Sequence, residues 1–208
     1  MSRPLIDYYF WLSSDWSFLG HRRLLAIAGR HNAVIRYLPV RMKLLLDKTG
    51  GMVLSQRSPQ RQRYRLDELR RWRDRLGFPI NLAPAHFPVD NEKALRVVAG
   101  AIASGHDVGE LVEAYMRAVW VEERDIADRG VVLDIASRRG LRGAEIDTWI
   151  ASAETDQTLT ANTAAAAEAG AFGAPTYVVA GEVFWGQDRL DFLAERVTAL
   201  ALSALARS

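Results

Sequence analysis

The sequence contains no cysteine. This absence excludes disulfides, thiolate metal sites and redox chemistry carried by a thiol of the chain itself. Any thiol chemistry at a site of this protein must therefore use a thiol that another molecule supplies. The four histidines include no pair at metal-ligand spacing, so no metal site is expected either.

Lysine is scarce as well, and nearly all positive charge comes from arginine. The net charge of +2 is too small to favour a nucleic-acid partner. Residues 57–75 carry eight arginines, but the apolar spacing of this stretch predicts that they lie on the solvated side of a helix. No apolar run reaches the roughly 18 residues that cross a bilayer. No signal-peptide pattern opens the chain, so a cytoplasmic protein without a membrane partner is expected.

The order of predicted elements indicates the fold class. Residues 5–12 and 33–40 are predicted strands, and the helix between them implies that they are parallel. Residues 43–170 are predominantly helical, apart from the proline-broken segment 77–88. A hairpin around Ala180-Gly181 and a last helix complete the chain.

This order predicts an α/β protein with a thioredoxin-like core, β-α-β followed by β-β-α, and a large all-α insertion between the two halves. We expect the core to comprise residues 1–44 and 170–208 and the inserted helical domain to comprise residues 45–169. In a core of this kind the working residues lie between the first strand and the first helix.

The segment SSDWS, residues 13–17, occupies that turn. A helix start offers unpaired N–H groups and a partial positive charge, and both favour a bound thiolate. The Ser14 hydroxyl is the candidate donor to such a sulfur. The alternative is an ordinary cap, in which Ser13, Ser14 or Asp15 accepts from the amides of the first turn.

Two later segments complete the candidate site. In FGAPT, the Ala174-Pro175 bond is a candidate cis peptide, and the backbone before it could pair with an extended peptide. In WGQDRL, Gln187 and Asp188 precede the last helix. Asp188 is expected to be its N-cap, or else to pair with the ammonium of a ligand.

Together these segments resemble the 2-hydroxychromene-2-carboxylate isomerases and the kappa-class glutathione transferases, a DsbA-like branch of the thioredoxin superfamily. The family pattern of a strand followed by S-P-[aromatic]-S-[aromatic]-L is similar to SDWSFL. The family segments F-G-x-P-T and W-G-x-D-R-L match FGAPT and WGQDRL. The resemblance extends over nearly the whole chain.

The resemblance implies glutathione as the cofactor and assigns roles to matching residues. Ser14 matches the serine that holds the glutathione thiolate, with Asp15 and Trp16 beside it. Ala174 and Pro175 match the pair whose backbone holds the cysteine unit. The remaining matched or suggested residues are Gln187 and Asp188 for the γ-glutamyl end, Trp16 for the substrate ring, and Arg41 and Lys43 for an anionic substrate carboxylate.

The implied function is conversion of 2-hydroxychromene-2-carboxylate, or a related intermediate of aromatic degradation, to trans-o-hydroxybenzylidenepyruvate by reversible thiolate addition. The expected partners are a small aromatic carboxylate and a second copy of the chain. A kappa-like glutathione transferase and a non-catalytic thioredoxin-like binding module remain alternatives.

The chain departs from the family pattern at two places. Asp15 stands where the family usually has proline, and TGGM, residues 49–52, lacks an asparagine that is often present there. The first change could perturb the helix start, and the second removes an expected glutathione contact.

Overall fold

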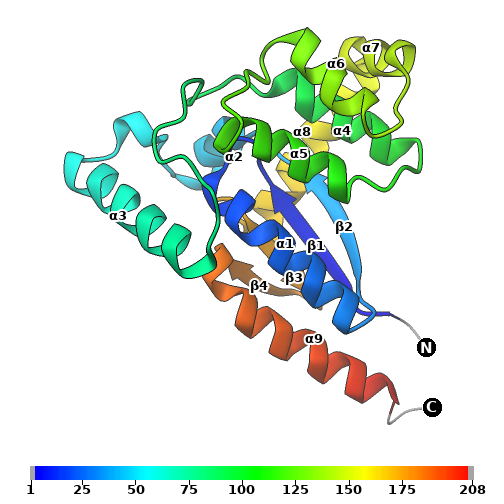
Figure 1. The fold of residues 1–208 in the computed structure, drawn as a ribbon. Helices are drawn as coiled ribbons and strands as arrows, with labels where there is room; N and C mark the ends of the chain where they lie inside the picture. Colours follow the sequence, from blue (N-terminus) through cyan, green and yellow to red (C-terminus); the bar gives the residue numbers. More distant parts are fainter. Residues whose placement is uncertain (1–2, 206–208) are drawn as a thin grey trace.

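One mixed four-stranded sheet organises the protein, which a computed structural model describes over residues 3–205 (Figure 1). The strand order is β2-β1-β3-β4. The strands are β1 (Leu5–Phe10), β2 (Val34–Pro39), β3 (Thr176–Val179) and β4 (Glu182–Trp185). β1 is parallel to β2, as the predicted β-α-β unit requires, and it is antiparallel to β3.

Helices cover both faces of the sheet (Figure 1). Because successive side chains of a strand point to opposite faces, the neighbours Tyr8 and Tyr9 of β1 belong to different cores. The helices α1 (Asp15–Arg30) and α9 (Leu190–Leu205) pack on the Tyr8 side. On the Tyr9 side, α2 (Met42–Thr49) and α8 (Ala153–Glu168) pack against each other.

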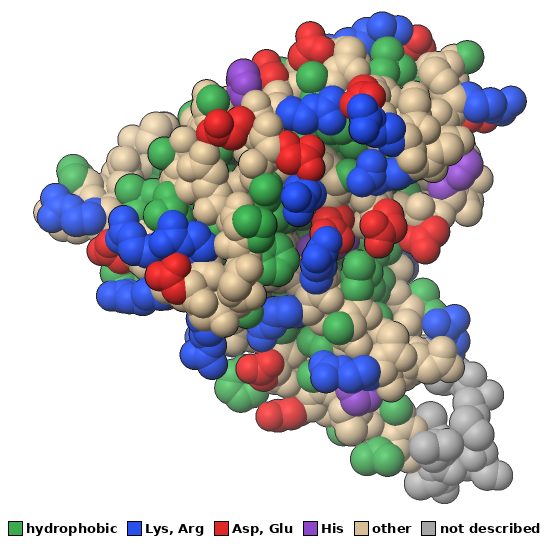
Figure 2. Space-filling view, in the orientation of Figure 1, with side chains coloured by type: hydrophobic (Ala, Val, Ile, Leu, Met, Phe, Trp, Pro, Cys, Tyr) green, Lys and Arg blue, Asp and Glu red, His purple; other side chains and the backbone are tan. Residues whose placement is uncertain are grey.

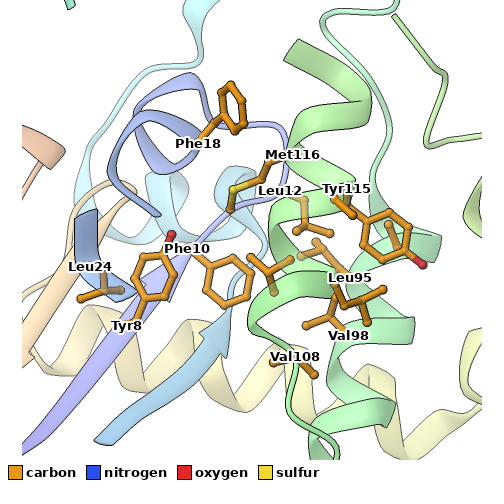
Figure 3. Packing of buried hydrophobic residues seen from close by; sticks show 14 of the residues in the cluster. Tyr8, Phe10, Leu12, Phe18, Leu24, Leu95, Val98, Val108, Tyr115 and Met116 are labelled. Carbon is orange, nitrogen blue, oxygen red and sulfur yellow. The ribbon is translucent and has the colours of Figure 1, made fainter. Parts of the chain in front are cut away.

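The inserted helices share the larger core with the sheet. They are α3 (Pro59–Leu76), α4 (Glu92–Ala103), α5 (Gly109–Trp120), α6 (Arg129–Ser137) and α7 (Gly143–Ala151). Figure 3 shows Tyr8 and Phe10 of β1 in the same apolar cluster as Leu95 of α4 and Met116 of α5. The insertion and the thioredoxin-like core are therefore held together by one continuous set of buried side chains.

α3 projects away from this core as an arm (Figure 1). Ser58 caps its start, Pro59 occupies the first turn, and Gly77 ends it at a φ of +62° that favours glycine. Of the predicted apolar face, Leu69 is fully buried, whereas Leu66 is 37% exposed. The arm is thus attached along only part of its length.

The structure confirms the predicted fold class. The β3–β4 hairpin turns at Ala180 and Gly181, both with positive φ, as a two-residue hairpin turn requires. Residues 77–91 contain no helix or strand, as their prolines predicted. α8, which was assigned to the insertion, also contacts β2, so the predicted domain boundary stays a prediction. Within residues 3–205, no helix combines the length and apolarity needed to cross a membrane.

Candidate functional site

The turn between β1 and α1 brings Ser14 against the segment that precedes β3. Ser14 is 5% exposed and is the N-cap of α1, because its hydroxyl oxygen accepts a hydrogen bond from the Ser17 N–H at 3.1 Å. The same hydroxyl donates to the Ala174 carbonyl oxygen at 3.3 Å. The cap and the candidate catalytic position are therefore one residue. The hydroxyl proton already points out of the helix, toward the FGAPT segment.

The FGAPT segment has the geometry that was predicted for it. The Ala174-Pro175 peptide bond is cis. The Pro175 carbonyl accepts from the Gly186 N–H at 2.9 Å, and the Thr176 hydroxyl donates to the Gly173 carbonyl at 2.7 Å. Among residues 3–205, the Ala174 N–H donates no hydrogen bond. This amide is a donor that an extended ligand backbone could use.

Ser13 differs from Ser14 because its hydroxyl contacts residues of the inserted helical segment. It is fully buried, and its hydroxyl accepts from the Asn91 side-chain amide at 2.6 Å and lies 3.4 Å from the Val89 carbonyl. Both partners lie just before α4. Ser13 therefore fixes the turn, which leaves Ser14 as the serine of the candidate site.

Asp15 forms a buried ion pair that the sequence did not indicate. Its carboxylate lies 2.5 Å from the Arg65 guanidinium, and both side chains are almost inaccessible, at 7% and 12% exposure. The other carboxylate oxygen accepts from the Trp16 N–H at 2.8 Å. The prediction that the arginines of this stretch lie on the solvated side of the helix is therefore wrong for Arg65.

The first turn of α1 offers fewer free amides than expected. Ser14 engages the Ser17 N–H, and Asp15 engages the Trp16 N–H. Burial raises the pKa of the Asp15 carboxyl, and the Arg65 charge opposes that rise. Trp16 itself is half-buried, with its side chain packed against the main hydrophobic core.

Gln187 and Asp188 lie in a short 3-10 turn, η2 (Gln187–Arg189), between β4 and α9. Gln187 is 2% exposed, and Arg23 of α1 donates to its backbone and side-chain oxygens at 3.0 and 2.8 Å. This contact ties the turn to the middle of α1. Arg23 is a structural partner that sequence reasoning missed, since nothing local to the WGQDRL motif points to it.

The structure does not place Asp188 as an N-cap. α9 begins two residues later, and Gly186 precedes the 3-10 turn as its N-cap, without a side-chain cap hydrogen bond. Its carboxylate is 45% exposed and lies 3.5 Å from the neighbouring Arg189 guanidinium. The default expectation of a helix cap is wrong because the 3-10 turn moves the helix start. A ligand role for the exposed carboxylate stays a prediction.

Arg41 and Lys43 lie near the carboxyl end of β2, in different settings. Arg41 is held by Glu92 at 2.5 Å and Asp156 at 2.6 Å, and the hydrogen bond to Glu92 raises its pKa. Lys43 is 79% exposed and pairs with Asp47, one turn along α2. Their roles toward a substrate stay predictions, although Arg41 already lies in a cluster in which it and Arg96 share the carboxylates of Glu92 and Asp156.

Comparisons with known proteins identify the family of the chain. The family model of the DSBA-like thioredoxin domain matches residues 5–198. A 2-hydroxychromene-2-carboxylate isomerase of Sphingobium xenophagum is 28% identical over 190 residues, which is 90% of this chain and 95% of that protein. One of Pseudomonas putida is 26% identical and covers 91% of this chain and 92% of its own.

Solved structures support the same fold. A 2-hydroxychromene-2-carboxylate isomerase structure superposes with a TM-score of 0.78 at 24% identity, covering 98% of this chain and 99% of that chain. The cytosolic disulfide reductase DsbM of Pseudomonas aeruginosa with GSH gives a TM-score of 0.67 at 18% identity, covering 97% and 99%. The predicted resemblance is thus confirmed, and the chain belongs to the DSBA-like thioredoxin domain family.

Proposed function

We propose that the protein is a glutathione-dependent cis-trans isomerase of 2-hydroxychromene-2-carboxylate or a related aromatic carboxylate. The observation that carries this proposal is the pairing of the buried Ser14 hydroxyl with the Ala174 carbonyl in a chain that has no cysteine. Relatives that align over about nine-tenths of the chain are named isomerases of that compound. A site built like a thiol site, but without a thiol, favours a borrowed sulfur.

The residues at the site fit glutathione. The Ala174 N–H, which has no partner among residues 3–205, can donate to the cysteine unit of a γ-glutamyl tripeptide. The Ser14 hydroxyl can rotate its proton from the Ala174 carbonyl to a sulfur. The half-exposed Asp188 carboxylate is available to the ligand ammonium. When bound, glutathione supplies a thiol that adds reversibly to the conjugated double bond of the ring-opened substrate.

The chain itself has three tasks in this reaction. Ser14 donates to the sulfur and keeps its pKa low, and the positive end of α1 supports it. The half-buried Trp16, which lies two residues after Ser14, offers an aromatic surface to the substrate ring. Lys43, the more exposed of the two predicted cations, attracts the substrate carboxylate. The neighbouring Arg41 then serves mainly to hold α2, α4 and α8 together.

The test is an isomerisation assay with 2-hydroxychromene-2-carboxylate in the presence of glutathione, of no thiol, and of an analogue in which a methyl group replaces the thiol. We expect trans-o-hydroxybenzylidenepyruvate only with glutathione, which is not consumed. Consumption of glutathione into a stable conjugate would instead indicate a transferase. Equal rates without the thiol would contradict the proposal.

A further inference from the structure

The Asp15–Arg65 pair joins the start of α1 to the α3 arm directly beside Ser14. The two residues are 50 positions apart in the sequence, and their charged atoms lie 2.5 Å apart. A buried pair of this kind is weak evidence for stability, because desolvation of both charges offsets their attraction. Because the pair lies beside Ser14, we consider its effect on the candidate site.

Arg65 is unlike the other arginines of the arm. Figure 2 shows basic side chains spread over the surface of the molecule on the side where α3 lies, and Arg63, Arg70 and Arg71 are exposed. Arg65 instead lies over the rings of Phe87 and Trp120, at 5.2 and 5.8 Å from their centroids. The two aromatic rings and the Asp15 carboxylate together hold its guanidinium in place.

The negative charge of Asp15 would repel a thiolate bound at Ser14. It is the first residue of α1, so its negative charge occupies the same positive end of the helix that would stabilise the sulfur. It also takes the Trp16 N–H. Since adjacent Cα atoms are only about 3.8 Å apart, an unmatched charge on Asp15 would oppose a second negative charge at Ser14.

We propose that Arg65 is a positioning residue that neutralises Asp15 and thereby leaves the start of α1 able to stabilise a thiolate at Ser14. This inference rests on the proposed function. The positive charges that act on the carboxylate are Arg65 and, at longer range, Arg57, which precedes α3. Its remaining partner is the Trp16 amide on α1. The arm therefore supplies the counter-charge that α1 itself lacks.

The proposal predicts opposite effects for the two members of the pair. Asp15→Asn keeps an acceptor for the Trp16 N–H but leaves Arg65 unmatched, so the thiol of bound glutathione should become more acidic. Arg65→Met leaves Asp15 unmatched, so that thiol should become less acidic wherever Asp15 is ionised. Each shift in the thiol pKa should be about one unit, a tenfold change in acidity. The double variant should return to the wild-type value.

The experiment measures the ultraviolet absorbance of the glutathione thiolate across pH, with saturating wild type, Asp15→Asn, Arg65→Met and the double variant. Arg63→Met, an exposed arginine of the same helix, is the matched control and should not change the titration. If Arg65→Met does not fold, Asp15→Asn still has to lower the thiol pKa. A pair with only a structural role would reduce stability without shifts of opposite sign.

The experiment distinguishes failure of the proposed function from failure of the role proposed for Arg65. If the wild type binds no glutathione, both the proposed function and this inference are overturned. If glutathione binds and its thiol pKa is equal in all four proteins, only the role of Arg65 is overturned.

Discussion

Two polar turns are predicted to hold the two ends of one ligand, and they are built in different ways. At the start of α1, Ser13, Ser14 and Asp15 are buried, and each side chain has a partner from a distant segment. Before α9, Gln187 is buried against Arg23, but Asp188 is half-exposed. The proposed sulfur end is therefore fixed before a ligand arrives, whereas the proposed γ-glutamyl end keeps an accessible charge.

The largest effect is expected from breaking the buried pair at the first turn. Arg65→Met should lower the free energy of unfolding by about 3–5 kcal/mol at neutral pH, because it leaves a buried carboxylate without its counter-ion. The loss should shrink as the pH falls, since burial raises the pKa of Asp15 and the protonated form needs no counter-ion. Denaturant unfolding at two pH values measures this. A loss no larger than that of Arg63→Met would contradict it.

The second effect is a loss of stability at low pH that comes from His21. This side chain connects the middle of α1 to the start of α5. The His21 side chain is fully buried, its Nε2 lies 3.0 Å from the Gly109 carbonyl oxygen, and burial lowers its pKa from 6.5 to about 4. The unfolded chain binds the proton more readily, so stability should fall by about 3 kcal/mol as the pH drops from 6.5 to 4.

The control for this acid effect is His86, which is exposed. His21→Gln should flatten the dependence of stability on pH in that window, and His86→Gln should leave it unchanged. The slope of unfolding free energy against pH is the measurement. A wild-type slope that survives in His21→Gln would assign the acid loss to other groups.

A third prediction compares the two adjacent serines. Ser14→Ala should raise the activation free energy, measured as kcat/KM for glutathione, by about 1.5–3 kcal/mol, because a hydrogen bond to a charged sulfur is lost. Ser13→Ala should chiefly reduce the melting temperature, since Asn91 and Val89 lose their buried partner. If Ser13→Ala reduced catalysis more than Ser14→Ala, the choice of serine would be wrong.

The smallest effect is expected at the exposed end. Asp188→Asn should weaken glutathione binding by about 1 kcal/mol, or about fivefold, because a half-exposed charge is screened by water. The melting temperature should not change, since Asp188 caps no helix in the described structure. Glu195→Gln, which neutralises an exposed carboxylate of α9, is the matched control. Unchanged affinity in Asp188→Asn would remove this residue from the site.

Sequence reasoning succeeded where a local pattern carries the information. The strand before Ser14 and the hairpin at Ala180-Gly181 follow from residue types at fixed spacing. The cis bond at Ala174-Pro175 was expected from the predicted architecture rather than from the local residues alone. The presence of a cap was also predicted from the local sequence, which left Ser13, Ser14 and Asp15 as candidates, and the structure shows that Ser14 is the cap.

The sequence could not show partners that come from distant segments. Arg65 is one of eight arginines in its stretch, and only the return of residues 77–91 and α5 encloses it with aromatic rings. The signal that was available was Asp15 itself, since a carboxylate at a buried helix start requires a counter-charge. The prediction of a cap at Asp188 was wrong for a different reason. A 3-10 turn precedes α9 and moves the first residue of that helix to Leu190.

In the proposed function, the Ser14 hydroxyl contacts the sulfur of bound glutathione. The most direct test is a calorimetric titration of wild type and Ser14→Ala with glutathione and with the analogue in which a methyl group replaces the thiol. We predict that the wild type prefers glutathione by at least tenfold and that Ser14→Ala loses most of this preference, because the hydroxyl and the sulfur interact directly. An equal preference in both proteins would show that Ser14 does not contact the sulfur.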